Sequence, residues 1–277
     1  MASRHEAFEK AARIGYTAKG VVYGVVGILA FRTAIGAGGG TTGAGGALRE
    51  IGQQPYGQSL LTLTGLGLLG YVVWRALQAF ADAESEGTDA KGLVKRIAFA
   101  VSGIVYILLA IQALAIAWGP TGGGGGRGAT GWTAELMSQP FGRWLVALVG
   151  AIFIAVAVNH FIRAGRASFM KSYETGGMSP RQVQWARRIG RFGIAARGVT
   201  FAIIGVLLIE AARSADPEEA RGLAGALSTL LEQPYGPWLL GLVAVGFIAY
   251  GVYCFSRAKY RRIDAGDTPA HARAATR

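Results

Sequence analysis

Long apolar runs alternate along this chain with Gly-rich or basic stretches. Six runs hold the roughly 20 apolar residues that a helix needs to cross a hydrocarbon layer of about 30 Å. They lie approximately at 15–35, 59–80, 97–118, 143–162, 192–212 and 238–255. Backbone groups in lipid must be paired within the segment, and these runs are too long and too continuously apolar for barrel strands. The pattern therefore predicts an all-α membrane protein with six transmembrane helices.

The six runs form three similar pairs. The first member of each pair opens alike, in "RIGYTAKGVVYGVVG" (13–27), "RIAFAVSGIVYILLA" (96–110) and "RFGIAARGVTFAIIG" (191–205). The second member follows a Gln-Pro-aromatic-Gly motif each time. We therefore divide the chain into three helical hairpins, repeat 1 over 11–80, repeat 2 over 94–166 and repeat 3 over 187–263, with a cytoplasmic tail over 264–277.

The repeats are expected to be parallel, because each hairpin crosses the membrane twice and the next therefore enters from the same side. Parallel repeats are related by an axis along the membrane normal. We expect a pseudo-threefold arrangement in which first and second spans alternate around that axis.

A short amphipathic segment precedes each Gln-Pro motif. Its apolar positions follow the i, i+3, i+4, i+7 spacing of one helix face. They are Ala44, Ala47, Leu48 and Ile51, then Ala129, Trp132, Thr133 and Leu136, then Leu223, Ala226, Leu227 and Leu230. Each hairpin should therefore carry a short helix lying on the outer membrane surface.

The Gln-Pro-aromatic-Gly motif is interpreted as a corner from this short helix into the second span. A residue before proline avoids helical dihedrals, proline suits the first turn of the next helix, and the aromatic residue fits the head-group belt. The alternative is a ring of three glutamines that lines an outer vestibule. The motif residues are Gln54, Pro55, Tyr56 and Gly57, then Gln139, Pro140, Phe141 and Gly142, then Gln233, Pro234, Tyr235 and Gly236.

Taken together, the repeated motifs Arg-x-Gly/Ala-x4-Gly-x2-aromatic and Gln-Pro-Tyr/Phe-Gly resemble bacterial membrane proteins of domain-of-unknown-function family 1206. The resemblance covers about residues 11–263, and repeat 2 departs from the first motif at Ala98 and Ser102. It implies six helices in a bacterial cytoplasmic membrane. It carries no established activity and no catalytic residues.

Positive charge lies mainly on one side of the predicted spans. Of the 28 Lys and Arg residues, 22 fall on the side of the N-terminal tail, the 81–96 loop, the 163–191 connection and the C-terminal tail, counted with the span ends beside them, and 6 fall with the other connections and their flanking span ends. This asymmetry predicts a multi-pass protein with both termini cytoplasmic. We expect the basic runs at 187–191 and 257–262 to meet anionic lipid head groups. The net charge of +12 does not indicate a nucleic-acid partner, because no soluble basic face carries base-reading groups.

Polar residues inside the spans are costly and are candidates for function. Lys19 and Arg197 occupy one repeat position, and Arg75 and His160 share another with Cys254. One interpretation is that the long cations reach outward to the membrane interface. The alternative is that Lys19, Arg75, His160 and Arg197 converge near the axis and form an anion or proton site. At the outer ends, Arg32 and Glu210 coincide and are expected to pair with each other or with head groups.

The sequence offers little for enzyme chemistry. His5, His160 and His271 are scattered, the single Cys254 cannot form an intramolecular disulfide, and no acidic pair lies deep in a span. The Gly-rich runs lack Gly-Lys-Ser/Thr and are read as linkers. We therefore expect no catalytic, cofactor-binding or metal-binding residues.

Two functions remain. The sequence favours a non-catalytic membrane scaffold or accessory subunit, with a membrane-protein partner or a second copy of the chain as its contact. The alternative is a small-solute, anion or proton pathway between the three hairpins. The absence of a polar stripe along any full span favours the first, and it predicts a centre filled by Gly, Ala, Leu and aromatic residues.

Overall fold

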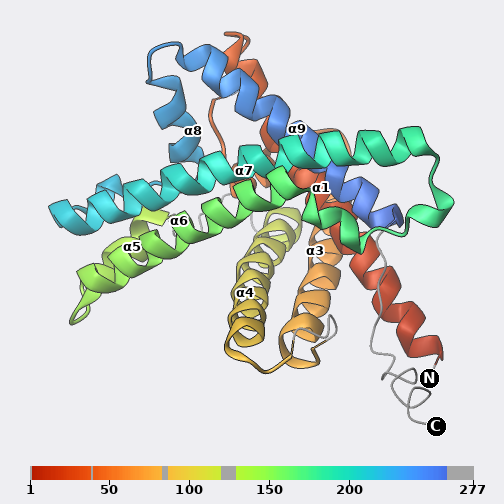
Figure 1. Ribbon diagram of the computed structural model, residues 1–277. Coiled ribbons are helices and arrows are strands. Elements are labelled where there is room, and N and C mark those ends of the chain that lie inside the picture. The colour runs from red at the N-terminus through yellow and green to blue at the C-terminus, as the bar shows by residue number, and fades with distance from the viewer. Residues whose placement is uncertain (1, 39, 83–86, 120–128, 261–277) are drawn as a thin grey trace.

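A computed structural model describes residues 2–38, 40–82, 87–119 and 129–260, so the tail at 264–277 lies outside the described residues. The described residues form nine α-helices joined by turns and short 3-10 segments. Six helices are long and apolar enough to cross a membrane, which confirms the predicted spans. They are α1 (Ala2–Ala34), α3 (Gly57–Phe80), α4 (Ala90–Trp118), α6 (Gly142–Arg166), α7 (Pro180–Ser214) and α9 (Gly236–Tyr260) (Figure 1).

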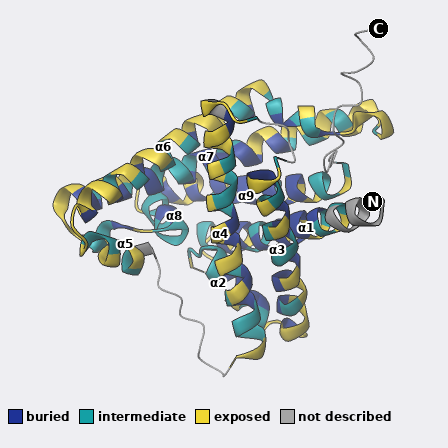
Figure 2. Ribbon diagram, turned by 90° about the horizontal axis from the view of Figure 1, so that it is seen from below, coloured by how far each residue is buried: buried dark blue, intermediate teal, exposed yellow. Residues whose placement is uncertain are grey.

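The spans follow one another in space in the order α4, α3, α1, α9, α7, α6. Repeat 1 (α1, α3) and repeat 3 (α7, α9) therefore pack together at the centre. In Figure 1, the α3/α4 pair and the α6/α7 pair run in different directions. The spans of repeat 2, α4 and α6, make almost no contact with each other over their described lengths. Exposed residues accordingly follow much of α6 in Figure 2.

Glycines bring the repeats together at three interfaces. On α1, a Cβ built at Gly27 would lie 2.8 Å from the carbonyl oxygen of Ala244 on α9. On α6, one at Gly150 would lie 2.9 Å from the carbonyl oxygen of Gly205 on α7, and Gly65 of α3 meets Leu114 of α4 similarly. Small residues let membrane helices approach closely. A glycine thus allows close approach at corresponding places in the interfaces α9·α1, α3·α4 and α6·α7.

Inside repeats 1 and 3, a second glycine contact joins the two spans. Gly15 lies against the backbone of Tyr71, and Gly193 lies against the backbone of Tyr250. In both cases a Cβ on the glycine would come within 2.6 Å of the tyrosine backbone. The same position in repeat 2 is Ala98, which is exposed. Repeat 2 therefore departs from the first motif at the position where glycine joins the two spans in the other repeats, and its own two spans do not pack together.

The three predicted short helices are present as α2 (Ala44–Gln53), α5 (Ala129–Met137) and α8 (Leu223–Leu231). Their expected place on the membrane surface is wrong for α2 and α8. Leu48 of α2 and Leu227 of α8 are fully buried in one cluster that includes Val26 of α1 and Leu240 of α9. These apolar faces are covered by protein because α2 and α8 pack against the spans. On α5, Thr133 is buried and Trp132 is exposed.

Each corner motif forms the same tight turn. The N–H of the closing glycine donates to the carbonyl of the glutamine, at 2.8 Å in Gly57→Gln54 and 2.7 Å in Gly236→Gln233. The aromatic residue between them is left-handed, with φ of 62° at Tyr56, 61° at Phe141 and 61° at Tyr235. Proline at the second position and positive φ at the third are the features of a type II turn.

This turn corrects one expectation and explains the glycine. Proline does not open the second span, because α3 begins at Gly57, two residues after Pro55. A Cβ on Gly57 would overlap the carbonyl oxygen of Gly52, and one on Gly142 would overlap that of Leu136. The motif therefore ends with glycine because the new helix starts directly against the end of the short one.

Candidate functional site

Three predicted polar residues come together in the half of the bundle near the α1 N-terminus. Lys19 on α1 is only 4% exposed, and its Nζ donates to the hydroxyl of Tyr71 at 3.2 Å. Arg75 on α3 donates from Nη2 to the same hydroxyl at 2.5 Å and from Nη1 to Gln78 at 2.8 Å. Two cations therefore share one phenolic oxygen.

Arg197 on α7 extends this group toward α9. Its Nη1 donates to the hydroxyl of Tyr250 at 2.6 Å, and its Cζ lies 4.6 Å from the centre of that ring. The Nζ of Lys19 lies 5.6 Å from the same ring centre. We call Lys19, Arg75 and Arg197 the cation cluster. Its members come from three helices and two repeats, and tyrosines lie between them.

Aromatic side chains fill the space around the cation cluster. The rings of Tyr71 and Tyr106 lie 4.7 Å apart, and those of Tyr23 and Tyr250 lie 5.0 Å apart. The hydroxyls of Tyr23 and Tyr106 are 3.5 Å apart. These contacts bring α1, α3, α4 and α9 together at the centre, with aromatic residues there as expected.

The outward orientation favoured for the long cations is wrong for Lys19 and Arg197. Lys19 is buried, and Arg197 lies against the rings of Tyr23, Phe201 and Tyr250 at 4.6 to 4.9 Å. Cations are attracted to the faces of aromatic rings. The inward direction is therefore stabilised by a tyrosine-lined site that spacing along one span does not reveal.

His160 joins the cluster only indirectly. Its Nδ1 lies 2.8 Å from the carbonyl oxygen of Val156 on its own helix, α6. Its ring packs edge-on against Phe201 with the ring centres 5.1 Å apart, and Phe201 lies beneath Arg197. Cys254, at the corresponding position of repeat 3, is buried.

The expected pairing of Arg32 with Glu210 is wrong. Glu210 instead accepts from Arg213 one turn later on α7, with the closest N–O distance at 2.6 Å. Arg32 donates to the carbonyl of Ala37 at 3.4 Å. Each side chain therefore bonds to a residue three to five positions away in the sequence, Glu210 within α7 and Arg32 in the turn that follows α1.

The three corner glutamines are all exposed. The amide nitrogen of Gln54 lies 3.3 Å from the Glu50 carboxylate, and that of Gln233 lies 3.3 Å from the Thr229 carbonyl oxygen. Both donors thus bond back to the short helix that precedes them, which suits a corner.

Negative charge is missing around the cation cluster. Within the six predicted spans the sequence holds a single acidic residue, Glu210, which is near the outer end of its span. No group of three or more His, Cys, Asp or Glu side chains that could hold a metal ion occurs among the described residues. The cluster can therefore bind or orient an anion, and it has no carboxylate for proton transfer.

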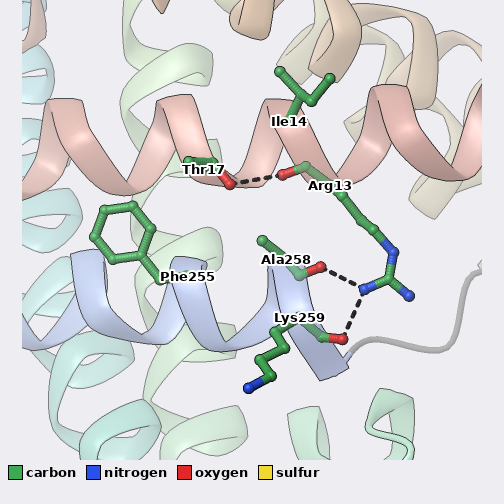
Figure 3. Close-up of a pocket in the computed structure, with 6 residues that line it drawn as sticks. All are labelled: Arg13, Ile14, Thr17, Phe255, Ala258 and Lys259. Carbon is green, nitrogen blue, oxygen red and sulfur yellow. Dashed lines mark hydrogen bonds between the residues drawn. The ribbon is translucent and has the colours of Figure 1, made fainter.

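The repeated arginines that open the first spans have a role that the sequence alone did not show. Arg13 donates from Nη1 to the carbonyls of Ala258 and Lys259 at the end of α9, both at 2.7 Å (Figure 3). Arg96 donates to Ala79 at the end of α3 at 2.8 Å, and Arg191 to Ala164 near the end of α6 at 2.9 Å.

Each of these arginines caps the second span that lies beside it in space. Cations near a helix C-terminus satisfy free carbonyls and oppose the helix dipole. Identical placement of arginine in all three repeats was the signal that could have identified a shared structural role. The three caps lie at the interfaces α9·α1, α3·α4 and α6·α7.

A shallow pocket of about 420 Å³ lies beside the Arg13 cap. It is lined by Arg13, Ile14 and Thr17 of α1 and by Phe255, Ala258 and Lys259 of α9, and the Arg13 side chain extends across to the end of α9 (Figure 3). The Arg13 guanidinium is already engaged by carbonyl oxygens. A second pocket, between α7 and α9, is lined mainly by apolar residues that include Trp185 and Val252. Both lie at the periphery and neither contains a member of the cation cluster.

Comparison with known proteins identifies the repeats. A family model described as Domain of Unknown Function (DUF1206) matches residues 14–82, 97–167 and 192–261. The Bacillus subtilis (strain 168) protein "Uncharacterized protein YxxB" is 41% identical over 251 residues, which cover 91% of this chain and 90% of that relative. No solved structure matches the chain. Because the family model matches three segments that together span most of it, this multi-pass membrane protein belongs to the DUF1206 family.

Proposed function

We propose that this protein is a non-catalytic membrane scaffold or accessory subunit. The observation that carries the proposal is the filled centre, where Tyr71 packs on Tyr106 and Tyr23 on Tyr250 with ring centres 4.7 and 5.0 Å apart. A conducting pathway needs solvated polar groups along its length. Rings in contact at mid-bundle oppose such a path and favour a role in which the outer surface makes the functional contacts.

The proposed arrangement is a pseudo-threefold ring of parallel hairpins that is open on one side. Three observations support it: spans alternate between first and second members, glycines join the repeats at corresponding places, and arginine caps recur at the same interfaces. The opening lies between α4 and α6. At the outer end, α2 and α8 close the ring.

We assign the protein to the bacterial cytoplasmic membrane with both termini on the cytoplasmic side. The 22-to-6 division of Lys and Arg supports this orientation, and the Bacillus relative supports a bacterial membrane. The exposed Arg187 and Arg188 suit anionic lipid head groups on that side. Reporters fused at either terminus should give a cytoplasmic signal, and one inserted within 120–128 an external one. A cytoplasmic signal from the insertion would refute the assignment.

The faces of α4 and α6 are the proposed contact with a membrane-protein partner or a second copy. In the most apolar part of each span, only 22% of α4 and 17% of α6 is buried inside the protein, against 61% of α1. A partner that covers these faces would supply the packing that the first and third repeats obtain from each other.

Cross-linking in native membranes tests the contact. In a Cys254→Ser background, cysteine at Ile104 on α4 should link to another chain through a bifunctional maleimide. The matched control is cysteine at Leu63 on α3, which is similarly exposed. Preferential linkage at Ile104 supports the scaffold, and equal linkage or none at both positions rejects this contact.

A small-anion pathway is the second candidate, and the cation cluster inside the bundle is the observation that favours it. Purified protein in liposomes should give no more chloride or proton flux than empty liposomes under the scaffold proposal. Flux that is lost in both Arg75→Gln and Arg197→Gln would replace that proposal with a pathway.

A further inference from the structure

The cation cluster is unbalanced in charge. Lys19, Arg75 and Arg197 make their hydrogen bonds to neutral groups, namely two tyrosine hydroxyls and the amide of Gln78. Charges taken out of water need a countercharge and further hydrogen bonds to offset desolvation. Aromatic faces stabilise a desolvated cation, but by less than the hydration that a buried ion loses. A bound anion would supply that countercharge.

The cluster also has unused donors. The Nε of Arg75 is buried and has no hydrogen-bond partner. Among the described residues, Lys19 and Arg197 each donate one hydrogen bond, to Tyr71 and to Tyr250. An ammonium and a guanidinium carry several more N–H groups than this. The free donors belong to three helices, as a site that surrounds an oxyanion requires.

The cluster borders on the two spans of repeat 2. The Cζ of Arg75 lies 5.0 Å from the ring centre of Phe99 on α4. Arg197 is next to Gly198, which faces His160 and Phe161 on α6. The Arg75 guanidinium thus lies beside α4, and the helix position next to Arg197 lies against α6; these are the two spans that do not pack together. Both are half-buried, whereas Lys19 lies deeper.

The depth suits a ligand that approaches from the cytoplasmic leaflet. Lys19 and Arg197 each lie six positions after a capping arginine, Arg13 or Arg191. At a rise of about 1.5 Å per residue this is roughly 9 Å further into the bundle. Guanidinium groups recognise phosphate through paired, charge-assisted hydrogen bonds. The absence of carboxylates from the inner parts of the spans leaves this role to a ligand.

We propose that Lys19, Arg75 and Arg197 together bind one phosphate-type oxyanion that enters between α4 and α6, supplied by an anionic lipid head group or by free phosphate. Tyr71 and Tyr250 hold the cations apart and keep their remaining donors directed at the ligand. The site binds without conducting, because the tyrosine rings fill the centre beside it. It is independent of whether the protein also acts as a scaffold.

Thermal unfolding of the full-length protein in a neutral detergent tests the site with two probes. One is sodium phosphate against sodium chloride at equal ionic strength. The other is a short-chain phosphatidylglycerol against the phosphatidylcholine of the same chain length. A ligand that binds only the folded state raises the unfolding midpoint with its concentration. We expect a saturable rise with at least one of the two anionic probes.

The variants are Arg75→Gln and Arg197→Gln, and the matched control is Arg213→Gln, which removes the same charge at an exposed outer position. Each site variant should weaken the apparent affinity at least tenfold, and the control should leave it unchanged. Arg75→Lys and Arg197→Lys keep the charge and should lose less affinity for the probe. They replace the Gln variants in the experiment if a Gln variant does not fold. Lys19→Met should likewise weaken the apparent affinity for the probe at least tenfold.

A response to phosphatidylglycerol alone assigns the oxyanion to lipid, and a response to phosphate alone assigns it to the free ion. No response to either probe overturns the proposal. So does a response that is equal in the site variants and in Arg213→Gln. Cross-linking at α4 does not enter this experiment, so failure of the scaffold proposal and failure of the site are distinguishable.

Discussion

The spans of repeats 1 and 3 pack within each repeat, and the spans of repeat 2 do not. In repeats 1 and 3 a glycine at the third position of the first motif lets the spans close, through Gly15 on Tyr71 and Gly193 on Tyr250. Repeat 2 has Ala98 there, and Val156 replaces the tyrosine. The contacts between neighbouring repeats are nevertheless alike, because a close glycine contact and an arginine cap recur at all three interfaces. One hairpin can therefore lose its internal packing while its links to the neighbouring repeats remain.

The chemistry of the three repeats differs in the same way. Repeats 1 and 3 supply Lys19, Arg75 and Arg197, together with the tyrosines that hold them. Repeat 2 has Ser102 at the position of Lys19 and Arg197. Its contribution to the centre is Tyr106, which lies 4.9 Å from the Nζ of Lys19. The repeat whose two spans do not pack together is thus also the one that adds no cation to the cluster.

The largest expected effect comes from adding a side chain at a glycine that holds the two spans of one repeat together. Gly193→Val should lower the free energy of unfolding by about 3 kcal/mol, at the upper end of the cost of overpacking, because its side chain would meet the Tyr250 backbone. Ala98→Val in repeat 2 should change it by less than about 0.5 kcal/mol, as at other exposed positions. Denaturant titration in detergent measures both. Equal losses would show that repeat 2 is packed like the others.

The corners should behave alike in all three repeats, in contrast to the interfaces. Gly57→Ala, Gly142→Ala and Gly236→Ala should each cost about 2 kcal/mol, within the range for overpacking, because each new Cβ would overlap a carbonyl of the preceding short helix. Unfolding midpoints of the three variants give the comparison. A mild effect at Gly142 alone would mean that repeat 2 also differs at its corner.

Loss of an arginine cap should cost less. Arg13→Gln, Arg96→Gln and Arg191→Gln should each lower stability by about 1 kcal/mol, the usual scale for a cation at a helix C-terminus. Arg187→Gln removes the same charge at an exposed position on α7 and is the control. The free energy of unfolding at low salt should separate the three caps from it. If the three cap variants lose no more stability than Arg187→Gln does, the arginine caps do not hold the repeats together.

The smallest effect concerns the left-handed aromatic residues. Tyr235→Asn should stabilise the corner by about 0.5 kcal/mol in detergent, because a left-handed backbone costs most residues about 1 to 2 kcal/mol and asparagine tolerates it better. Tyr235→Phe should be neutral. Phe141→Asn in repeat 2 should match Tyr235→Asn, since the two φ angles are both 61°. A loss of stability at both corners would mean that the aromatic ring contributes more than its backbone costs.

The sequence predicted the spans and short helices because apolar runs and periodicity report local structure directly. It also marked Ala98 and Ser102 as departures. It did not predict the left-handed turn at Tyr56, because an aromatic residue carries no preference for that conformation. Its pattern placed Lys19 and Arg197 at one depth but not facing one aromatic site, because the direction of a long side chain depends on which helices lie beside it.

Thiol accessibility in the purified protein tests most directly whether repeat 2 is open. Single cysteines in a Cys254→Ser background would replace Ala18 and Ala196 in the first spans of repeats 1 and 3, and Val101 at the same position of repeat 2. Ala18 and Ala196 are each 6% exposed, whereas Val101 is 55% exposed. A membrane-permeant maleimide should label the cysteine at 101 as fast as one at Leu63, which is 66% exposed, and those at 18 and 196 at least tenfold more slowly. Protection at 101 equal to that at 18 and 196 would contradict the open ring.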